Sequence, residues 1–482
     1  MKTYRLLIGL LITLILAPAV RAETMTTQAD QTSMRLTVYN QDLALVRDAR
    51  SIDIPAGESV LAFKEISSRI MPETALLRGD QFYVLEQNFE FDLLSPATLL
   101  NKYVGKPVTL ARPHPETGEE ILVSATVLST ANGVVLKVGN RIETIDTPVS
   151  GGAFGRLIYP DVPDNLRERP TLTMTLKSQK AGERPVELTY LTQGLSWKAD
   201  YVARLNPAED RLDLTAWVTL TNHSGTTFKD ADLQLVAGDV NRVRSEIVRP
   251  MAVERMDMKL AAAPEADVSR ESLMEYHLYS VSRQTTIKNN QSKQIALLRE
   301  ENGKCQKRLI LQSGTTRFYW NRTGQAYRKK SVDVMLRFKN DRASNFGLPK
   351  PAGIIRVYKT DSRGYDQFVG EDRIHHTPEN ETVDIMLGKA FDVTADRRQT
   401  HFSMSRASEE KRRIYENEFE IKLKNGKDRP VEVTVKETIP GDWQMISQSH
   451  THRKVDASTV SWVIQVPAKG SQDLTFRVRS KM

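Results

Sequence analysis

The stretch LTQGLSWKADYVARL, residues 191–205, raises a choice between a catalytic site and the interior of a β-sheet. Strand alternation from Leu195 places its apolar and aromatic residues on one face: Leu195, Trp197, Ala199, Tyr201 and Ala203. Ser196 does not lie in a Gly-x-Ser-x-Gly elbow, because Lys198 occupies the position of the second glycine. We therefore predict a strand with a buried Trp197 face rather than a nucleophile at Ser196.

The same period-2 alternation extends through most of the chain, and helical periodicity is scarce. Alternating runs around Pro55-Ala56-Gly57 predict a small N-terminal β domain over residues 23–94. A short helix is expected after Ser95, a good N-cap. Short strands separated by turn residues follow it, which indicates a small SH3-like barrel over residues 95–155.

Three later segments share one pattern, in which an alternating strand stops at an asparagine and enters a polar loop. These residues are Asn222, Asn340 and Asn425, and asparagine ends strands because it tolerates the left-handed conformation. The pattern favours antiparallel, immunoglobulin-like β-sandwiches. We expect a mostly β protein in which the first sandwich part covers residues 156–244, a charged linker covers 245–272, and a C-terminal sandwich region covers 273–482.

The chain begins with the features of a secretory signal peptide. Lys2 and Arg5 precede an apolar run over residues 6–16, and small residues follow at Val20 and Ala22. The run is too short to span a bilayer, and no later stretch approaches the required length. We expect residues 1–22 to be removed, so that a mature chain without a transmembrane span starts near Glu23 in the periplasm or outside the cell.

Charge and cysteine content narrow the classes of function. The net charge of +8 falls to +5 without Lys2, Arg5 and Arg21. Cys305 is the only cysteine in the 482 residues, so the chain has no internal disulfide, and a lone thiol is more often a small buried apolar group than a nucleophile. Outside the cytoplasm, a basic surface meets anionic glycans or lipid headgroups sooner than nucleic acid.

The basic charge is concentrated between Lys304 and Lys339, where ten lysines and arginines accompany one acid, Asp333. Aromatic residues alternate with these cations, which suits stacking on sugars or pairing with acidic groups. The alternative is a strand pair whose charged side faces water. The candidate ligand-binding residues are Arg317, Tyr319, Trp320, Arg322, Tyr327, Arg328, Lys329 and Lys330.

The densest polar cluster, VGEDRIHHTPENE, offers imidazoles and carboxylates between Glu371 and Glu381. A metal site could use such groups, but the spacing matches no helical zinc motif and Pro378 disfavours the helix that would align them. A charged turn between two strands is the simpler interpretation. We therefore assign no catalytic residue, metal ligand or cofactor, and keep an envelope-modifying hydrolase at this cluster as the alternative.

Several long motifs resemble a bacterial family, the domain of unknown function 4139, which includes the mucoidy inhibitor A proteins. They are YLTQGLSWKADYVARL, WVTLTNHSGTTFKDADLQLVAGDVNRV and the segment from FGLPKPAGIIRVYKTD to MLGKAFDV, and the resemblance covers roughly residues 186–482. It implies an exported β-sandwich protein without known catalytic residues, loosely associated with suppression of exopolysaccharide overproduction. The long coiled-coil insertion of the mucoidy inhibitor A proteins has no counterpart here.

These observations together favour a non-enzymatic, exported β-rich protein that binds an envelope component. The expected partner is an anionic envelope glycan or a periplasmic or outer-membrane protein, and not nucleic acid. Besides the hydrolase, a structural component of an envelope assembly, joined through exposed strand edges, is a further alternative.

Overall fold

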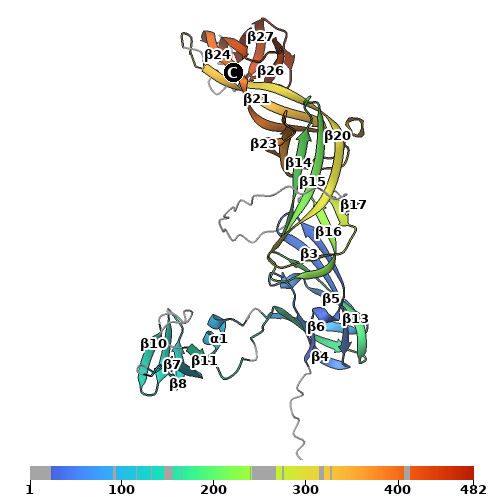
Figure 1. Cartoon of the computed structure of the whole chain (residues 1–482), viewed down its shortest axis with the longest axis vertical. Helices are drawn as coiled ribbons and strands as arrows, with labels where there is room; N and C mark the ends of the chain where they lie inside the picture. The colour runs from blue at the N-terminus through green and yellow to red at the C-terminus, as the bar shows by residue number, and fades with distance from the viewer. Residues whose placement is uncertain are drawn as a thin grey trace, which may run out of the picture.

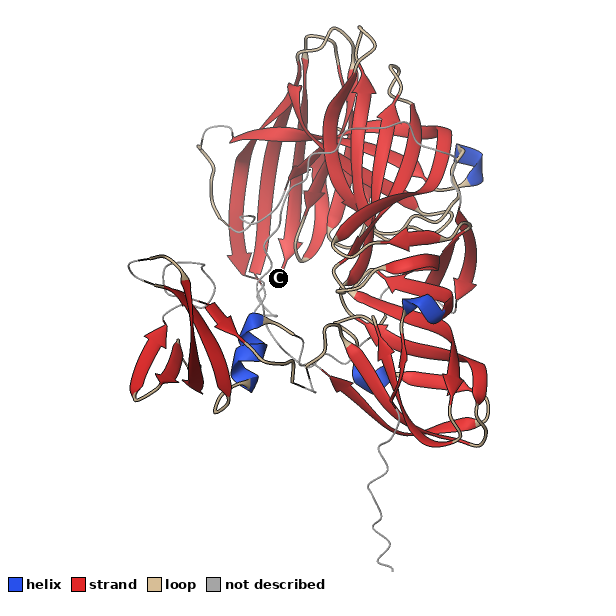
Figure 2. Ribbon diagram, turned by 60° about the horizontal axis from the view of Figure 1, so that its bottom comes forward, coloured by secondary structure: helices blue, strands red, loops and turns tan. Residues whose placement is uncertain are grey.

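The computed structural model describes residues 23–90, 94–114, 117–131, 133–145, 156–163, 166–238, 240–241, 268–273, 276–313, 318, 320–325, 328–406 and 413–482. Outside these ranges lie the expected signal peptide, residues 245–267 of the expected linker, and the candidate residues Arg317, Tyr319 and Tyr327. The described part is mostly β, as predicted, and Figure 2 shows strands in nearly all of it. In the described ranges no helix is long and apolar enough to cross a membrane.

The N-terminal region forms two sheets. A four-stranded sheet has the order β1 (Glu23–Thr26), β4 (Gly57–Lys64), β12 (Thr171–Ser178) and β6 (Phe82–Glu90). An eight-stranded sheet has the order β17 (Val268–Leu273), β18 (Tyr276–Val281), β16 (Phe228–Ala237), β2 (Gln31–Tyr39), β3 (Leu43–Ile54), β13 (Gly182–Thr192) and β5 (Leu76–Gly79), with β19 (Thr285–Ile287) paired to β16. Short 3₁₀ turns lie at η1 (Gln28–Asp30) and η2 (Pro72–Thr74).

A small unit is inserted between β6 and β12. Its helix α1 (Pro96–Lys102) begins where predicted, because the Ser95 side chain accepts a hydrogen bond from the Thr98 N–H. The sheet has the order β10 (Arg141–Ile145), β9 (Val134–Val138), β8 (Glu120–Ser129), β7 (Pro107–Pro113) and β11 (Arg156–Ile158). Among the described strands β10 and β11 remain unpaired edges, so an antiparallel sheet is established without closure into a barrel. Figure 1 shows it beside the long stack of the other sheets.

The largest sheet has thirteen strands and contains the C-terminal half of the chain (Figure 1). Its order is β23 (Asp366–Ile374), β22 (Gly353–Thr360), β14 (Leu195–Leu205), β15 (Arg211–Asn222), β20 (Gln291–Ser313), β21 (Arg328–Lys339), β24 (Thr382–Arg406), β25 (Arg413–Asn425), β30 (Ser471–Lys481) and β27 (Asp442–Gln448). Off this path lie β26 (Val431–Thr438), β28 (Arg453–Lys454) and β29 (Thr459–Val466), and η3 (Arg342–Ser344) precedes β22.

The segment LTQGLSWKADYVARL contains the core strand β14, as predicted. In β14 the whole predicted apolar face is buried, and the Trp197 Nε1–H donates to the Val236 carbonyl at 3.2 Å. The opposite face differs at Asp200, which is 5% exposed and accepts bonds from Thr219 Oγ1 at 2.8 Å and an Arg356 guanidinium nitrogen at 3.2 Å. Cross-strand partners, which alternation alone does not identify, therefore allow this carboxylate to be buried.

Three buried asparagines recur in equivalent positions. Asn222, Asn340 and Asn425 each donate through Nδ2 to one carbonyl of the loop that follows and to two consecutive carbonyls of a distant turn. None has the left-handed backbone that the sequence suggested. The asparagines instead hold two loops together from inside, since one amide supplies donors to several buried carbonyls.

The strands around each asparagine follow one plan, which defines three consecutive units. The strand after each asparagine, β16, β22 or β26, pairs in parallel with an earlier strand, β2, β14 or β20 respectively. Neighbouring units share strands, because β20 pairs first with β15 and then with β21, and β24 pairs first with β21 and then with β25. The units are thus joined by continuous strands rather than by flexible connections.

Candidate functional site: a cation-lined pocket at the junction of neighbouring units

The predicted basic stretch is divided between several surroundings. Arg337 pairs with Asp384 at 2.5 Å, and Lys339 pairs with Asp341 at 2.8 Å, so two of its cations are matched by acids. Among the candidate ligand-binding residues, Trp320 is 59% exposed and the Arg322 guanidinium lies 5.8 Å from its ring centre. This pair does not converge on a described pocket.

The remaining candidates lie on β21. Arg328 and Lys329 are exposed at its start, and Lys330 is half-buried. They pair through the backbone with Arg397, Asp396 and Ala395 of β24. The contribution of these three cations to binding stays a prediction.

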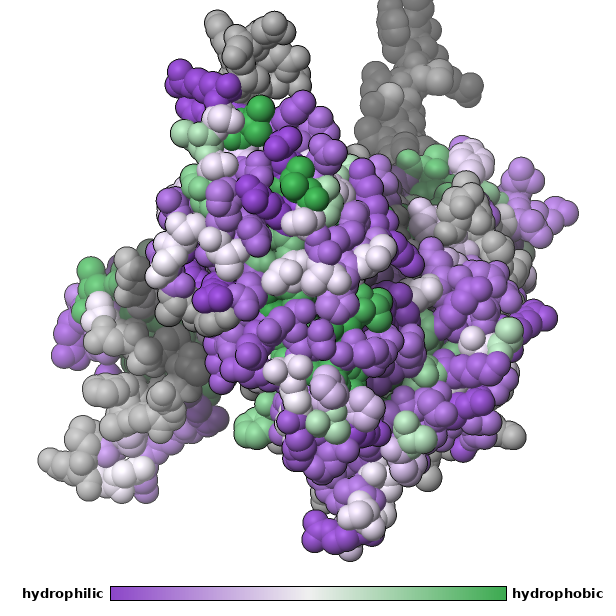
Figure 3. All heavy atoms as spheres, turned by 90° about the horizontal axis from the view of Figure 1, so that it is seen from above, coloured by the Kyte–Doolittle hydropathy of each residue, from purple (hydrophilic) through white to green (hydrophobic). Residues whose placement is uncertain are grey.

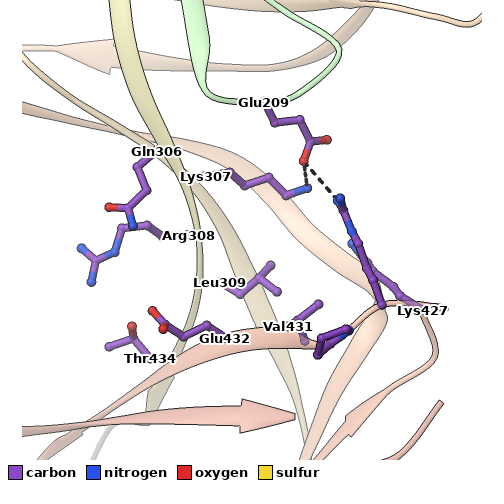
Figure 4. Close-up of a pocket in the computed structure, with 11 residues that line it drawn as sticks. Glu209, Gln306, Lys307, Arg308, Leu309, Lys427, Val431, Glu432 and Thr434 are labelled. Atoms are coloured by element: carbon purple, nitrogen blue, oxygen red, sulfur yellow. Dashed lines mark hydrogen bonds and ion pairs between the residues drawn. The ribbon is translucent and has the colours of Figure 1, made fainter. Parts of the chain in front are cut away.

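A different part of the basic stretch lines a pocket of about 380 Å³. Lys307 and Arg308 of β20 form one wall, Lys427 and Arg429 from the loop between β25 and β26 form another, and Glu209 from the β14–β15 turn lies above them (Figure 4). These residues come from three separate segments, and one of them, β20, is shared by neighbouring units. The pocket therefore exists only because the units are packed end to end.

Glu209 forms ion pairs with three cations at this pocket. Its carboxylate accepts a bond from Lys307 Nζ at 2.5 Å and from Lys359 Nζ at 2.6 Å, and Arg429 approaches to 3.5 Å. Burial alone would raise the pKa of Glu209, but the two ammonium groups outweigh it and lower the pKa from 4.5 to about 2. Glu209 is therefore ionised at neutral pH and holds β20 and β22 together.

Local structure fixes Lys427 and Arg429 at the pocket. The Lys427 N–H donates to Asn425 Oδ1 at 3.0 Å, and Asn425 Nδ2 donates to the Arg429 carbonyl at 2.8 Å. The Gly426 N–H also donates to the Asp392 carbonyl at 2.7 Å. One of the three repeated asparagines thus positions the two cations whose loop closes the pocket.

The pocket has more positive than negative charge. Four cations and two carboxylates line it, Glu209 and Glu432, and Lys359 adds a fifth cation through Glu209. Burial lowers the pKa of Lys427, and the nearby Lys307 and Arg429 lower it further, whereas Glu209 and Asp392 offset only part of this effect. Within the described residues no carboxylate forms an ion pair with Lys427, so an anionic ligand would relieve this repulsion.

A larger hollow of about 1010 Å³ lies at the N-terminal region and has a different charge balance. Glu65 and Glu168 are matched there by Arg169 and Lys229, and Glu65 pairs directly with Arg169. With equal numbers of acids and bases, this hollow has no comparable preference for an anion.

The polar cluster between Glu371 and Glu381 comprises the end of β23 and the mostly exposed connection from β23 to β24, so only its second part is the turn that the sequence predicted. Glu371 pairs with Arg356 at 3.2 Å, and Glu379 pairs with Arg342 at 3.4 Å. Asp372 accepts a bond from the Met386 N–H at 2.7 Å, and His376 Nδ1 accepts one from the Ala352 N–H at 3.2 Å. These contacts lead to different elements, which is typical of a charged turn.

Metal binding and a reactive thiol are two further kinds of site that the described residues can be compared with. In the ranges that the structure describes, no group of three His, Cys, Asp or Glu side chains is placed to hold a metal ion. Cys305 is half-buried, and burial raises the pKa of its thiol to about 12. At neutral pH the thiol is therefore protonated and a poor nucleophile.

Sequence reasoning did not select Glu209, Lys359, Lys427 or Arg429. Glu209, Lys359 and the Lys427–Arg429 loop are far apart in the chain, and strand pairing brings them together. The loop NGKDRP, residues 425–430, carries a local signal, since its asparagine follows a strand and its cations flank Asp428. Without the structure, this pattern does not show that the loop lines a pocket.

Fold and site together define a mostly β protein of repeated, strand-sharing units with a cation-lined pocket at their junction. The chain belongs to the family described as domain of unknown function (DUF4139), whose model matches residues 186–482. The matched region includes all three asparagines and every residue of the pocket. Among curated proteins, none matches the chain.

Proposed function

We propose that this chain is an exported, non-enzymatic binding protein that recognises an anionic group of an envelope component in the pocket beside Glu209. The observation that supports this is the excess of cations there, among which Lys427 is partly desolvated and has no ion pair with any residue that the structure describes. Partly buried charges are weakly screened, so an anion would gain more there than on an open surface.

The proposed compartment and domain type follow from the sequence. A cleaved leader ending at Ala22 would place the protein in the periplasm or outside the cell, where anionic glycans are abundant. The repeated units, with antiparallel strands and one parallel pairing each, suit immunoglobulin-like sandwiches. An anionic glycan is the partner that we favour, and an acidic protein of the periplasm or outer membrane is the alternative.

The test measures binding of a labelled polyuronate and a neutral dextran across a salt series. The pocket variant is Lys427→Ala/Arg429→Ala, and the matched control is Arg453→Ala/Lys454→Ala, which removes two exposed cations from β28. Because each charge-assisted hydrogen bond contributes about 1.5–3 kcal/mol, the pocket variant should lose at least about tenfold in affinity for polyuronate at low salt. The control should bind as the wild type does.

A third variant, Arg328→Ala/Lys329→Ala/Lys330→Ala, separates the pocket from the stretch that the sequence selected. Loss of binding in this variant but not in the pocket variant would move the site to the start of β21. Equal binding by every variant, or none by the wild type to any anion, would refute the proposed function.

A further inference from the structure

Phe391 is an anomaly on the surface of β24. Its side chain is 95% exposed, the highest value among the large apolar side chains exposed in the described residues. The face in Figure 3 is mostly hydrophilic, with apolar groups in small separate patches. A single exposed apolar residue needs no explanation by itself. Phe391, however, also lies close to the pocket.

Phe391 lies next to the loop that carries the pocket cations. Asp392 follows it, and the Asp392 carbonyl accepts the Gly426 N–H at 2.7 Å. Phe391 and Lys427 are therefore each one residue from the same hydrogen bond. Val393, the next residue of β24, is paired with Asn425 and buried, so the strand is anchored immediately beyond the exposed ring.

This arrangement places an exposed aromatic ring and an ammonium that forms no ion pair within the described part of the chain on adjacent backbone segments. We propose that Phe391 and the cations Lys427 and Arg429 form one composite site for an acidic saccharide, an inference that rests on the proposed function and specifies its ligand. A uronate has an apolar C–H face on its ring and a carboxylate attached to the same ring. The C–H face of the sugar ring would pack against the Phe391 side chain, and the carboxylate of the sugar would approach Lys427 and Arg429.

The two parts of the site respond to different forces. Contact between the sugar ring and Phe391 buries apolar surface, which salt does not screen. Attraction between the carboxylate and the cations is electrostatic and weakens as the Debye length falls from about 10 Å at 0.1 M to about 3 Å at 1 M salt. A simple inorganic anion would use only the second part.

The experiment compares a uronate oligomer, a neutral glucan oligomer and inorganic phosphate as probes by calorimetric titration. Phe391→Ala should weaken binding of the uronate oligomer about tenfold, since one aromatic contact is removed, and should leave its salt dependence unchanged. Phosphate binding should be unaffected. Phe391→Tyr keeps the ring and should restore the affinity, whereas Tyr83→Ala, which removes an exposed aromatic from β6, should have no effect.

The outcomes separate this inference from the proposed function. If Phe391→Ala binds the uronate oligomer like the wild type while Lys427→Ala/Arg429→Ala loses it, the composite site is wrong and the cationic pocket stands. If phosphate binds and the uronate oligomer does not, the ligand is not an acidic saccharide and an acidic protein becomes the partner to test. If the pocket variant changes no binding, both proposals fail.

Discussion

Replacing Asn425 by alanine should damage both the fold and the pocket. Asn425 is 3% exposed, and its Nδ2 donates to the carbonyls of Arg429 at 2.8 Å and Pro467 at 3.0 Å. Alanine leaves these carbonyls without that donor, and each unsatisfied buried acceptor costs about 1–3 kcal/mol. Because the loop borders solvent and water can replace part of the loss, we expect a decrease of about 2–4 kcal/mol in the free energy of unfolding.

The repeated plan supplies a matched control in the same chain. Asn222 is also buried and donates to three carbonyls, but its loop does not line the pocket. Asn222→Ala should therefore cost a similar free energy of unfolding and leave anion binding intact. Asn425→Ala should lower it, because the loop no longer fixes Lys427 and Arg429.

Urea unfolding followed by circular dichroism gives the stability difference, and polyuronate titration at a temperature where both variants are folded gives the affinity. A third variant, Asn425→Asp, should be less stable than Asn425→Ala, because a carboxylate oxygen would face the carbonyls that the amide now binds. A loss below about 0.5 kcal/mol in Asn425→Ala, the value expected of an ordinary surface change, would refute the reasoning. Equal weakening of binding in Asn222→Ala would show that stability, not positioning, controls affinity.

Three further predictions follow from buried or charged groups. Trp197→Ala should lower the free energy of unfolding by about 3–5 kcal/mol, whereas the exposed Trp320→Ala should change it by less than about 0.5 kcal/mol, both measured in urea. Because folding lowers the pKa of Glu209 from 4.5 to about 2, its contribution is present above pH 4.5 and is lost between pH 4.5 and 2. The stability gap between wild type and Glu209→Gln should thus close over that range, and a constant gap would contradict the ion-pair assignment. Cys305 should react slowly with a thiol reagent at pH 8 in the folded state, and rapid labelling would contradict its raised pKa.

The fold class could be predicted because strand periodicity is a local signal. In β14 every residue assigned to the apolar face is buried, and the helix after Ser95 starts with the expected cap. Strand order could not be predicted, since it depends on pairing between distant segments. The parallel contacts β2–β16 and β14–β22 are examples, because each joins residues more than a hundred positions apart.

The asparagine pattern was recognised for a partly mistaken reason. Asn222, Asn340 and Asn425 do follow strands in equivalent loops, but their side chains are buried donors rather than aids to a left-handed turn. Periodicity cannot distinguish these roles, because two of the three acceptors of each asparagine lie more than thirty residues away, as Thr377 does from Asn340. The sequence contained the repeat, and only the hydrogen bonds gave its physical cause.

For the candidate site, the sequence predicted the positive charge but not the residues that form the pocket. Counting cations between Lys304 and Lys339 selected a stretch that includes Lys307 and Arg308. Two other cations of that stretch are neutralised by acids, Arg337 by Asp384 across a strand pair and Lys339 by the nearby Asp341. Net charge along the sequence does not show which cations lack partners. That depends on Glu209, which lies about a hundred residues earlier and satisfies Lys307.

The shared strands explain why the excess of positive charge occurs at the junction. β20 carries Lys307 at the point where its pairing passes from β15 to β21, and the Asn425 loop meets β24 where its pairing passes from β21 to β25. Loops from successive units must converge at such points, because continuous strands leave no linker to separate them. The cations brought together there repel one another, which lowers the stability of the fold. The carboxylate of Glu209 offsets part of this repulsion. Glu209 and Asp392 offset part of the positive charge at Lys427, and the proposed anionic ligand would neutralise the rest.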